Sequence, residues 1–354
     1  MVLLYGATGF IGKSVSEKLS KLCDLIISGR DIQKLEIVSR RIYEKTKIKP
    51  LILQMDINEI HKFDLHKLGV KKIINLAYLP PNLLERFVLY SINNQIDYLD
   101  ISADTKSVIE IWRKYNPLAE EKKVLIIQPG GIETTTSETI ISDLKSSISK
   151  RVYILYESIF YMVPKSLKSL LYLISSSPTY TSLLNIYWDG REWIYTEAKI
   201  EKILNQSYLS IHTIDVATIP RLFADKSFEL RSYLRIPKIM KDLTPFLIHI
   251  NGTPIRNYVS KIVRKFMYSV DPQERKKDRL IIKLLLQEDT KSQRLITWEI
   301  ENPILLNEEL ILFYTQEMLK GEHMFGILPP TVAFPKAKQK IYEKIIRQEI
   351  YNIR

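Results

Sequence analysis

Three glycines near the start of the chain have the spacing of a nucleotide-binding turn. Gly6, Gly9 and Gly12 follow the apolar run VLLY at 2–5 and precede a helical pattern at 11–22. In such a turn the first glycine permits the sharp bend, the second lets a pyrophosphate approach the backbone, and the third lets the helix pack closely on the strand. Free N–H groups at the helix N-terminus favour negative charge. The pattern predicts a dinucleotide site at all three glycines, and a purely structural turn is the alternative.

The end of the second apolar run bears on which dinucleotide is bound. It reads Ser28-Gly29-Arg30-Asp31. A site that prefers NAD usually has a carboxylate here for the ribose 2′-hydroxyl, whereas an arginine accommodates a 2′-phosphate. Because Ser28 is uncharged and Arg30 follows it, the sequence favours NADP(H) over NAD(H). Asp31 could contact a ribose or cap the next helix.

The elements that must position these residues alternate in type over the first 130 residues. Short β-rich runs alternate with helical patterns, which is typical of a parallel α/β sheet, and the continuous apolar character of the runs indicates burial on both faces. The predicted fold class is α/β, a Rossmann doubly wound parallel sheet. The strand-like runs lie at 2–5, 25–28, 51–55, 73–77, 98–102 and 124–128, and the helical stretches at 11–22, 32–45, 81–94 and 105–115.

The pattern changes after residue 135. Longer alternating runs predict a mainly antiparallel sheet, with one hairpin at Asp189-Gly190 and a second between 279–289 and 294–300. The predicted organisation is therefore a Rossmann domain and a second α+β domain for substrate binding and dimerisation. The domains span 1–135, completed by a C-terminal helix at 330–354, and 136–329.

Composition excludes several classes of protein. The 354 residues carry a formal net charge of +12, but the basic residues are spread along the chain, so we expect no nucleic-acid partner. The single cysteine, Cys23, permits no intrachain disulfide and suits a cytoplasmic location. The five histidines lack paired metal-ligand spacing, so no metal is expected, and no apolar run is long enough for a transmembrane segment.

Four segments together resemble the saccharopine dehydrogenase-like oxidoreductases, a group that includes relatives described as trans-acting enoyl reductases. They are YGATGFIGKSV, SGRDIQKL, YLDISAD and the late FGILPPTVAF, and the resemblance covers most of 1–137 and roughly 320–335. It implies an NADP(H)-dependent oxidoreductase that acts on a small-molecule substrate, and a homodimer remains open. The cofactor contacts it implies are Gly6, Ala7, Thr8, Gly9, Phe10, Ile11 and Arg30, with Asp56 and Ile57 beside the adenine and Asn75, Ala77 and Tyr78 near the nicotinamide.

Two stretches depart from that family's pattern. The family's Asn-x-x-Gly-Pro region here contains Ala77-Tyr78-Leu79-Pro80, which lacks the glycine, and its Gly-Phe-Asp stretch here reads Gly130-Gly131-Ile132-Glu133. The substrate is therefore open. A cofactor-binding sensor or regulatory protein that has lost hydride transfer is the alternative function.

No catalytic residue is assigned, but the carboxyl ends of the strands are where a doubly wound fold binds its ligands. Polar candidates there are Tyr78, Asp100, Ser102, Asp104 and Glu133. Asp104 and Glu133 also suit helix caps. His323 deserves notice only because the family-like late segment returns to the cofactor domain, and a surface histidine is the alternative. The basic charge and the segment at 165–174 leave open a lipid-like substrate at a membrane surface.

Overall fold

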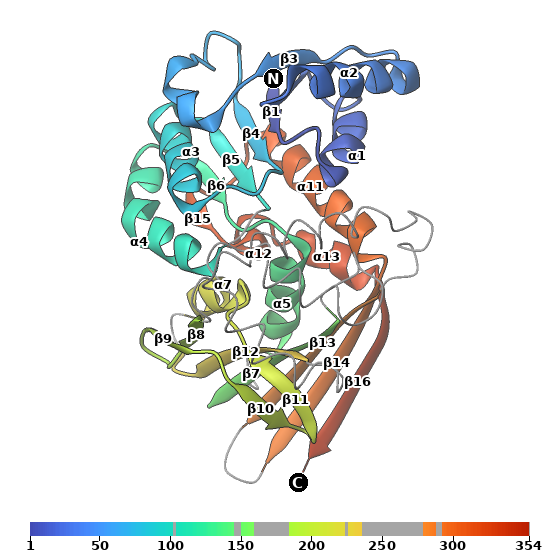
Figure 1. Cartoon of the computed structure of the whole chain (residues 1–354). Helices are drawn as coiled ribbons and strands as arrows, with labels where there is room; N and C mark the ends of the chain where they lie inside the picture. Colours follow the sequence, from blue (N-terminus) through green and yellow to red (C-terminus); the bar gives the residue numbers. More distant parts are fainter. Residues whose placement is uncertain are drawn as a thin grey trace, which may run out of the picture. The chain divides into compact units, whose positions relative to one another are not determined.

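The computed structural model describes residues 1–101, 104–144, 150–158, 184–223, 226–235, 279–287 and 292–353. The chain folds into two compact units, and each unit is made of two segments that are separate in the sequence (Figure 1). The first unit contains Met1–Thr135 and Asn307–Lys340, and the second contains Thr136–Leu306 and Ile341–Arg354.

The first unit contains a seven-stranded sheet in the order β15-β6-β5-β4-β1-β2-β3, in which all neighbours are parallel. The order is that of a doubly wound Rossmann sheet with one added edge strand, so the predicted fold class is confirmed. All six predicted strands are present. The strands are β1 (Val2–Tyr5), β2 (Leu25–Gly29), β3 (Leu51–Gln54), β4 (Lys72–Asn75), β5 (Asp97–Asp100), β6 (Leu125–Ile127) and β15 (Gly326–Leu328).

The four helices predicted between the strands begin where the sequence predicted, to within a residue, whereas η1 and α11 were not predicted. One ends later than expected: α4 continues through Pro117, because the buried Ile111, Tyr115 and Ala119 keep this face of the helix on the sheet. The helical elements, two of which continue into the second unit, are α1 (Phe10–Leu19), α2 (Ile32–Thr46), the 3₁₀ helix η1 (Ile57–Lys62), α3 (Pro81–Asn93), α4 (Thr105–Glu121), α5 (Ile132–Asp143), α11 (Pro303–Lys320) and α12 (Pro330–Ala333).

Apolar side chains of the central strands form the core of the first unit. Phe87 of α3 packs edge-on against Tyr5 and Tyr98, with ring centroids 5.7 and 5.2 Å away. Burial on both faces holds for the central strands but not for the edge strand β3, where Leu51 is 56% exposed. An edge strand has a neighbour on one side only, and sequence periodicity alone does not reveal this position.

The second unit contains a nine-stranded mixed sheet that is mostly antiparallel, as predicted. Its path is β10-β11-β12-β7-β13-β14-β16, with β8 pairing β12 and β9, and only β7 and β12 run parallel. Both predicted hairpins are present, as β8–β9 and β13–β14. The elements are β7 (Arg151–Ser158), β8 (Leu184–Trp188), β9 (Trp193–Glu197), β10 (Ile200–Ile203), β11 (Gln206–Ser210), α7 (Asp215–Leu222), β12 (Glu229–Arg235), β13 (Arg279–Gln287), β14 (Gln293–Glu301), α13 (Ala337–Tyr342, which begins in the first unit) and β16 (Ile345–Ile353).

The predicted C-terminal helix at 330–354 is wrong over its second half. Two short helices, α12 and α13, are followed by the strand β16, which pairs with β14 in the second unit and not with the Rossmann sheet. The sequence IIRQEIYNI is rich in β-branched and aromatic residues, and the free edge of β14 decides its conformation. The chain returns to the first unit at Asn307, earlier than predicted, through the second half of α11 and the strand β15.

Candidate functional site

The glycine turn joins β1 to α1 at the carboxyl edge of the Rossmann sheet, and each glycine meets a different constraint. Gly6 has φ +84°, and a Cβ there would lie 2.8 Å from the amide nitrogen of Ala77. A Cβ on Gly12 would lie 2.2 Å from the carbonyl oxygen of Gly6, because the helix packs directly on the turn. Backbone geometry thus requires glycine at these two positions.

Gly9 has a different environment from the other two glycines. Among the described residues, one atom lies within 4 Å of a Cβ built at Gly9, the carbonyl oxygen of Gly6 at 3.2 Å, so packing constrains this position less than it constrains Gly6 or Gly12. Gly9 is also the N-cap of α1, which has no side-chain cap and no acidic residue in its first turn. The turn therefore has an exposed backbone beside a helix N-terminus that carries partial positive charge.

The remaining predicted residues of the turn differ in exposure. Ala7 is fully buried, Thr8 and Ile11 are half-buried, and Phe10 is 44% exposed. The exposed edge of the turn therefore consists of Gly9 and Phe10, with partial contributions from Thr8 and Ile11.

Arg30 lies just after β2, beside the turn. Its side chain is exposed, and no described residue forms an ion pair or hydrogen bond with its guanidinium. Asp31 caps α2, because its carboxylate accepts the N–H of Lys34 at 3.1 Å and pairs with the Lys34 ammonium at 2.8 Å. Ser28 is buried and donates its hydroxyl to the carbonyl of Leu53 at 2.8 Å. Of this group, only Arg30 offers an unpaired charged side chain.

The residues predicted beside the adenine have local structural roles. The Asp56 carboxylate caps η1 by accepting the backbone N–H of Asn58 at 2.9 Å. Ile57 is 1% exposed and belongs to the hydrophobic core. Its side chain is therefore covered, and only the half-buried Asp56 presents a side chain to the surface at this position.

The loop after β4 carries the residues predicted near the nicotinamide. Asn75 is fully buried, and its Oδ1 accepts the N–H of Ala77 at 3.0 Å, which fixes the start of the loop. Ala77 is half-buried and contacts the Gly6 position, whereas Tyr78 is 47% exposed. Asn75 therefore positions the loop, and Tyr78 presents a phenol at its surface.

A row of buried polar groups crosses three neighbouring strands at the same edge. Asn75 of β4 pairs in register with Asp100 of β5, and extending the register of β5 and β6 brings Gln128 beside Asp100. Tyr98 donates its hydroxyl to Asp100 Oδ2 at 2.9 Å, and burial raises the pKa of this phenol well above its ordinary value. Both amide atoms of Gln128 are buried, and no described residue forms a hydrogen bond with either of them. Sequence analysis missed Gln128, although a polar residue directly after an apolar strand was a usable signal.

The other acid–base candidates have varied environments. Asp104 caps α4, since its Oδ2 accepts the N–H and the hydroxyl of Ser107 at 3.0 and 2.6 Å, as the capping alternative predicted. Glu133 is half-buried in the first turn of α5. Ser102 lies outside the described residues. The N-terminus of α5 receives a further partner, because Asn307 Oδ1 accepts the N–H of Ile132 at 3.1 Å.

His323 belongs to the segment that returns to the Rossmann unit, as expected, but its side chain is covered, so the alternative of a surface histidine is wrong. Its side chain is 3% exposed, and Nε2 lies 3.0 Å from Oδ2 of Asp97, the first residue of β5. Lys72, the first residue of β4, pairs with the same carboxylate. This cluster lies at the amino edge of the sheet, whereas the glycine turn lies at the carboxyl edge. The late segment does return to the Rossmann sheet, where β15 pairs with β6. Because His323 precedes β15, however, it lies at the end of the strands opposite to the glycine turn.

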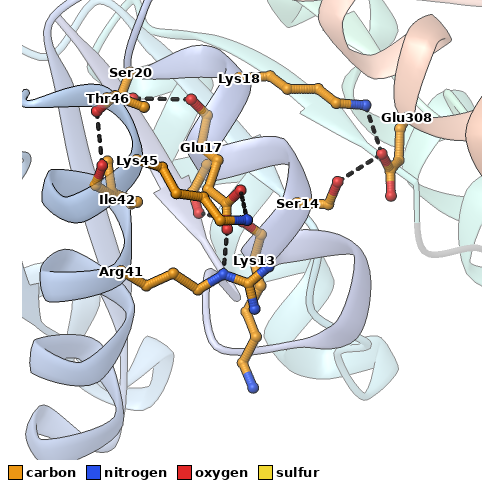
Figure 2. Close-up of polar contacts among 11 residues, drawn as sticks. Lys13, Ser14, Glu17, Lys18, Ser20, Arg41, Ile42, Lys45, Thr46 and Glu308 are labelled. Carbon is orange, nitrogen blue, oxygen red and sulfur yellow. Dashed lines mark hydrogen bonds and ion pairs between the residues drawn. The ribbon is translucent and has the colours of Figure 1, made fainter. Parts of the chain in front are cut away.

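Ion pairs and a hydrogen bond connect α1 to two other helices, α2 and α11 (Figure 2). Glu308 of α11 accepts the hydroxyl of Ser14 and the ammonium of Lys18, both at 2.7 Å. Glu17 pairs with Arg41 and, at 2.8 Å, with Lys45, both on α2. The helix that begins at the glycine turn is therefore fixed to elements from both ends of the chain.

The second unit contains a buried polar cluster that sequence analysis did not anticipate. Asp215 at the start of α7 accepts the hydroxyls of Tyr156 at 2.5 Å, Thr213 at 2.6 Å and Ser137. Burial nevertheless raises the pKa of Asp215, despite these three donors. Burial also lowers the pKa of Arg221 to about 9, an effect that the charge of Glu138 opposes. The helix α5 supplies polar residues to this cluster although it is almost entirely buried.

Among the described residues, no helix combines the length and apolar character needed to cross a bilayer, and no group of three metal-ligating side chains is found. The segment at 165–174, on which the expectation of a lipid-like substrate depended, lies outside the described residues.

Comparisons with known proteins bear on the fold. No protein-family model and no curated protein matches the sequence. The solved structure of apo saccharopine dehydrogenase (L-Glu forming) from Saccharomyces cerevisiae is similar over 100% of this chain and 99% of that chain, with a TM-score of 0.55 and 12% identity. The structure of GenD2 from gentamicin A biosynthesis, in complex with NAD, is similar over 100% of this chain and 96% of that chain, with a TM-score of 0.42 and 9% identity. A myo-inositol dehydrogenase from Corynebacterium glutamicum is similar over 96% of this chain and 93% of that chain, with a TM-score of 0.40 and 9% identity. The last two are too distant to support an argument, and the first shows that this chain shares the fold of saccharopine dehydrogenase.

Proposed function

We propose that this protein is an NADP(H)-dependent oxidoreductase of the saccharopine dehydrogenase-like type, acting on a small-molecule substrate. The observation that carries the proposal is the environment of Gly9, whose missing side chain leaves the backbone open beside the uncapped N-terminus of α1. Packing constrains this position less than it constrains Gly6 or Gly12, whereas an approaching pyrophosphate would require a residue without a side chain. The fold shared with saccharopine dehydrogenase agrees with this function.

The residues present fit a nicotinamide dinucleotide. The N–H groups at the start of α1 would bind the pyrophosphate, with Thr8, Phe10 and Ile11 along the exposed turn, and the unpaired guanidinium of Arg30 would bind a 2′-phosphate. Asp56 would lie beside the adenine. The loop held by Asn75 would contact the nicotinamide ring, which when bound supplies or accepts a hydride.

Among the catalytic candidates, Tyr78 and Glu133 are the ones we favour. Asp104 has a capping role, and Asp100 is fully buried and accepts the Tyr98 hydroxyl, so neither is placed to exchange a proton with a substrate. Tyr78 is 47% exposed and Glu133 is half-buried. Either could transfer a proton while the cofactor is positioned by the turn.

Calorimetric titration of NADPH and NADH tests the cofactor assignment. Removing a charge-assisted contact costs about 1.5–3 kcal/mol, which is roughly ten- to a hundredfold in affinity. We expect Arg30→Ala to weaken NADPH binding by this factor and to leave NADH binding unchanged. Arg40→Ala, at an exposed arginine of α2, is the matched control. If the wild-type protein binds neither nucleotide, the proposed function is wrong.

A second candidate function is a sensor or regulatory protein that binds the cofactor without hydride transfer. The structural roles of Asp100 and Asp104, together with the missing glycine before Tyr78, favour it. Tight NADPH binding with no oxidation of bound NADPH over a panel of ketones, imines and enoyl compounds would support this function. One reproducible turnover that depends on Tyr78 or Glu133 would exclude it.

We further propose a cytoplasmic homodimer. The edge strand β16 exposes Ile346 (47%) and Ile350 (58%). Antiparallel pairing of two copies about Gln348 would bring Ile346 opposite Ile350 of the partner subunit and Arg347 opposite Glu349 of the partner subunit. Both pairs are complementary, so this edge suits a second copy of the chain. The cytoplasmic location depends on the single half-buried cysteine.

A further inference from the structure

A cavity of about 470 Å³ lies on one face of the sheet in the second unit, and twelve of the described residues line it. Its walls come from the first residues of β7 and β12, the ends of β13, the start of β14 and the hairpin between β10 and β11. The volume falls within the range of small-molecule pockets. The cavity lies entirely within the second unit, whereas the proposed cofactor site belongs to the first.

Strand alternation explains which side chains line the cavity. Alternate residues of a strand point to the same face, so Arg151 and Tyr153 of β7 lie beside Arg231 and Tyr233 of the neighbouring β12. Tyr153 and Tyr233 pack edge to face with ring centroids 5.7 Å apart, and Leu285 lies against them. One part of the cavity is therefore an aromatic and apolar surface.

The opposite part is charged, and its cations are incompletely paired. Glu229 receives two guanidiniums: Arg151 Nε at 3.1 Å from Oε2, and Arg231 Nε on Oε1. Arg151 uses only Nε, and no described residue pairs with its two terminal nitrogens. Lys202 is exposed at the cavity and has no ion-pair partner among the described residues. Glu201 already accepts the hydroxyl of Tyr233 at 3.2 Å.

We propose that this cavity binds a small organic anion through the terminal nitrogens of Arg151 and the ammonium of Lys202. Among the described lining residues, three side chains are cationic and two are carboxylates, so one positive charge is in excess in this part of the cavity. A guanidinium binds a planar carboxylate or a phosphate in a bidentate manner, and the other end of the ligand would rest on the tyrosine surface. Gln287 and Gln293, paired across β13 and β14, provide amides for a neutral polar part of the ligand.

Calorimetric titration of the full-length protein with succinate and, separately, with inorganic phosphate tests this site at low ionic strength. We expect one of the two anions to bind the wild-type protein, and Arg151→Gln to weaken that binding roughly ten- to a hundredfold. Arg151→Lys should restore part of the affinity, because it keeps the charge but loses the bidentate geometry. The matched control is Arg279→Gln, an arginine of the same sheet that lies 3.8 Å from a glutamate outside the cavity.

The result with each anion identifies the ligand group. Binding of succinate alone assigns a carboxylate, and binding of phosphate alone assigns a phosphate. Lys202→Gln, on the exposed hairpin, tests the site independently if Arg151→Gln does not fold. The proposal is overturned if neither anion binds the wild-type protein, or if Arg279→Gln weakens binding as much as the cavity variants do. Because the measurement does not involve NADPH, its outcome is separate from that of the proposed function.

Discussion

Gly12→Ala tests whether the contact between α1 and the turn is as close as the structure has it. Alanine favours a helix interior over glycine by about 1 kcal/mol, so on propensity alone the variant should be more stable. The added Cβ, however, would lie 2.2 Å from the carbonyl oxygen of Gly6 and 2.9 Å from the Cα of Ala7. Both are backbone atoms that no rotamer change can move, and overpacking of this kind costs about 1–3 kcal/mol or more. A contact of 2.2 Å with a backbone atom belongs to the upper part of this range, about 2–3 kcal/mol, so after the gain in propensity we expect a net destabilisation of about 1–2 kcal/mol.

Urea unfolding followed by far-UV circular dichroism measures this difference. Gly9→Ala is the matched control, because a Cβ there would approach only one atom of the protein, at 3.2 Å. We expect Gly9→Ala to change the free energy of unfolding by less than about 1 kcal/mol but to weaken NADPH binding. A Gly12→Ala variant as stable as the wild-type protein, or more stable, would refute the close packing of α1 on the turn.

Three further predictions concern stability and assembly. Glu308→Ala removes the acceptor for two side chains of α1 and should lower the free energy of unfolding by about 1–2 kcal/mol. Glu36→Ala, at an exposed glutamate of α2, should leave the free energy of unfolding unchanged, and urea unfolding of the two variants measures the difference. Burial opposes the charged form of Asp97, but His323, Lys72 and a backbone N–H outweigh it and lower its pKa. The resulting stabilisation of the folded state is present above about pH 4 and lost below it. The difference in free energy of unfolding between the wild-type protein and Asp97→Asn should therefore shrink as the pH falls below about 4. A difference that stays the same at every pH would contradict this. Ile350→Lys on the edge of β16 should convert a dimer to a monomer in sedimentation velocity, and an unchanged dimer would exclude this edge.

The first unit could be predicted in detail from the sequence because its signals are local. Each strand is a short apolar run, and residues such as Asp31 and Asp104 cap the helices that follow them. Backbone geometry requires glycine at Gly6 and Gly12, and the sequence has glycine at both positions with the spacing of a nucleotide-binding turn. The predicted cofactor contacts remain proposals, although Arg30 lies unpaired at the expected strand end.

Features that depend on distant partners could not be predicted. The segment that forms β16 was predicted to be helical, but its pairing with the edge of β14 makes it a strand. His323 belongs to the late segment that returns to the Rossmann sheet, yet the direction of β15 brings it to Asp97 at the amino edge. Gln128 became a candidate only when the register aligned it with Asp100. In each case the partner is more than twenty residues away in sequence or in a different strand, and periodicity carries no information about it.

The position of β15 in the sheet has a consequence for synthesis on the ribosome. Beyond β6 the Rossmann sheet ends in an unpaired edge until Gly326–Leu328 has left the exit tunnel, and at about 5–20 residues per second this interval is on the order of ten to forty seconds. Throughout that time the nascent chain exposes backbone donors and acceptors that another strand could occupy. The first segment of the second unit, Thr136–Leu306, is translated within the same interval, whereas its last segment, Ile341–Arg354, follows β15. Chaperone binding to stalled chains that end before and after β15 would therefore differ sharply between the two lengths.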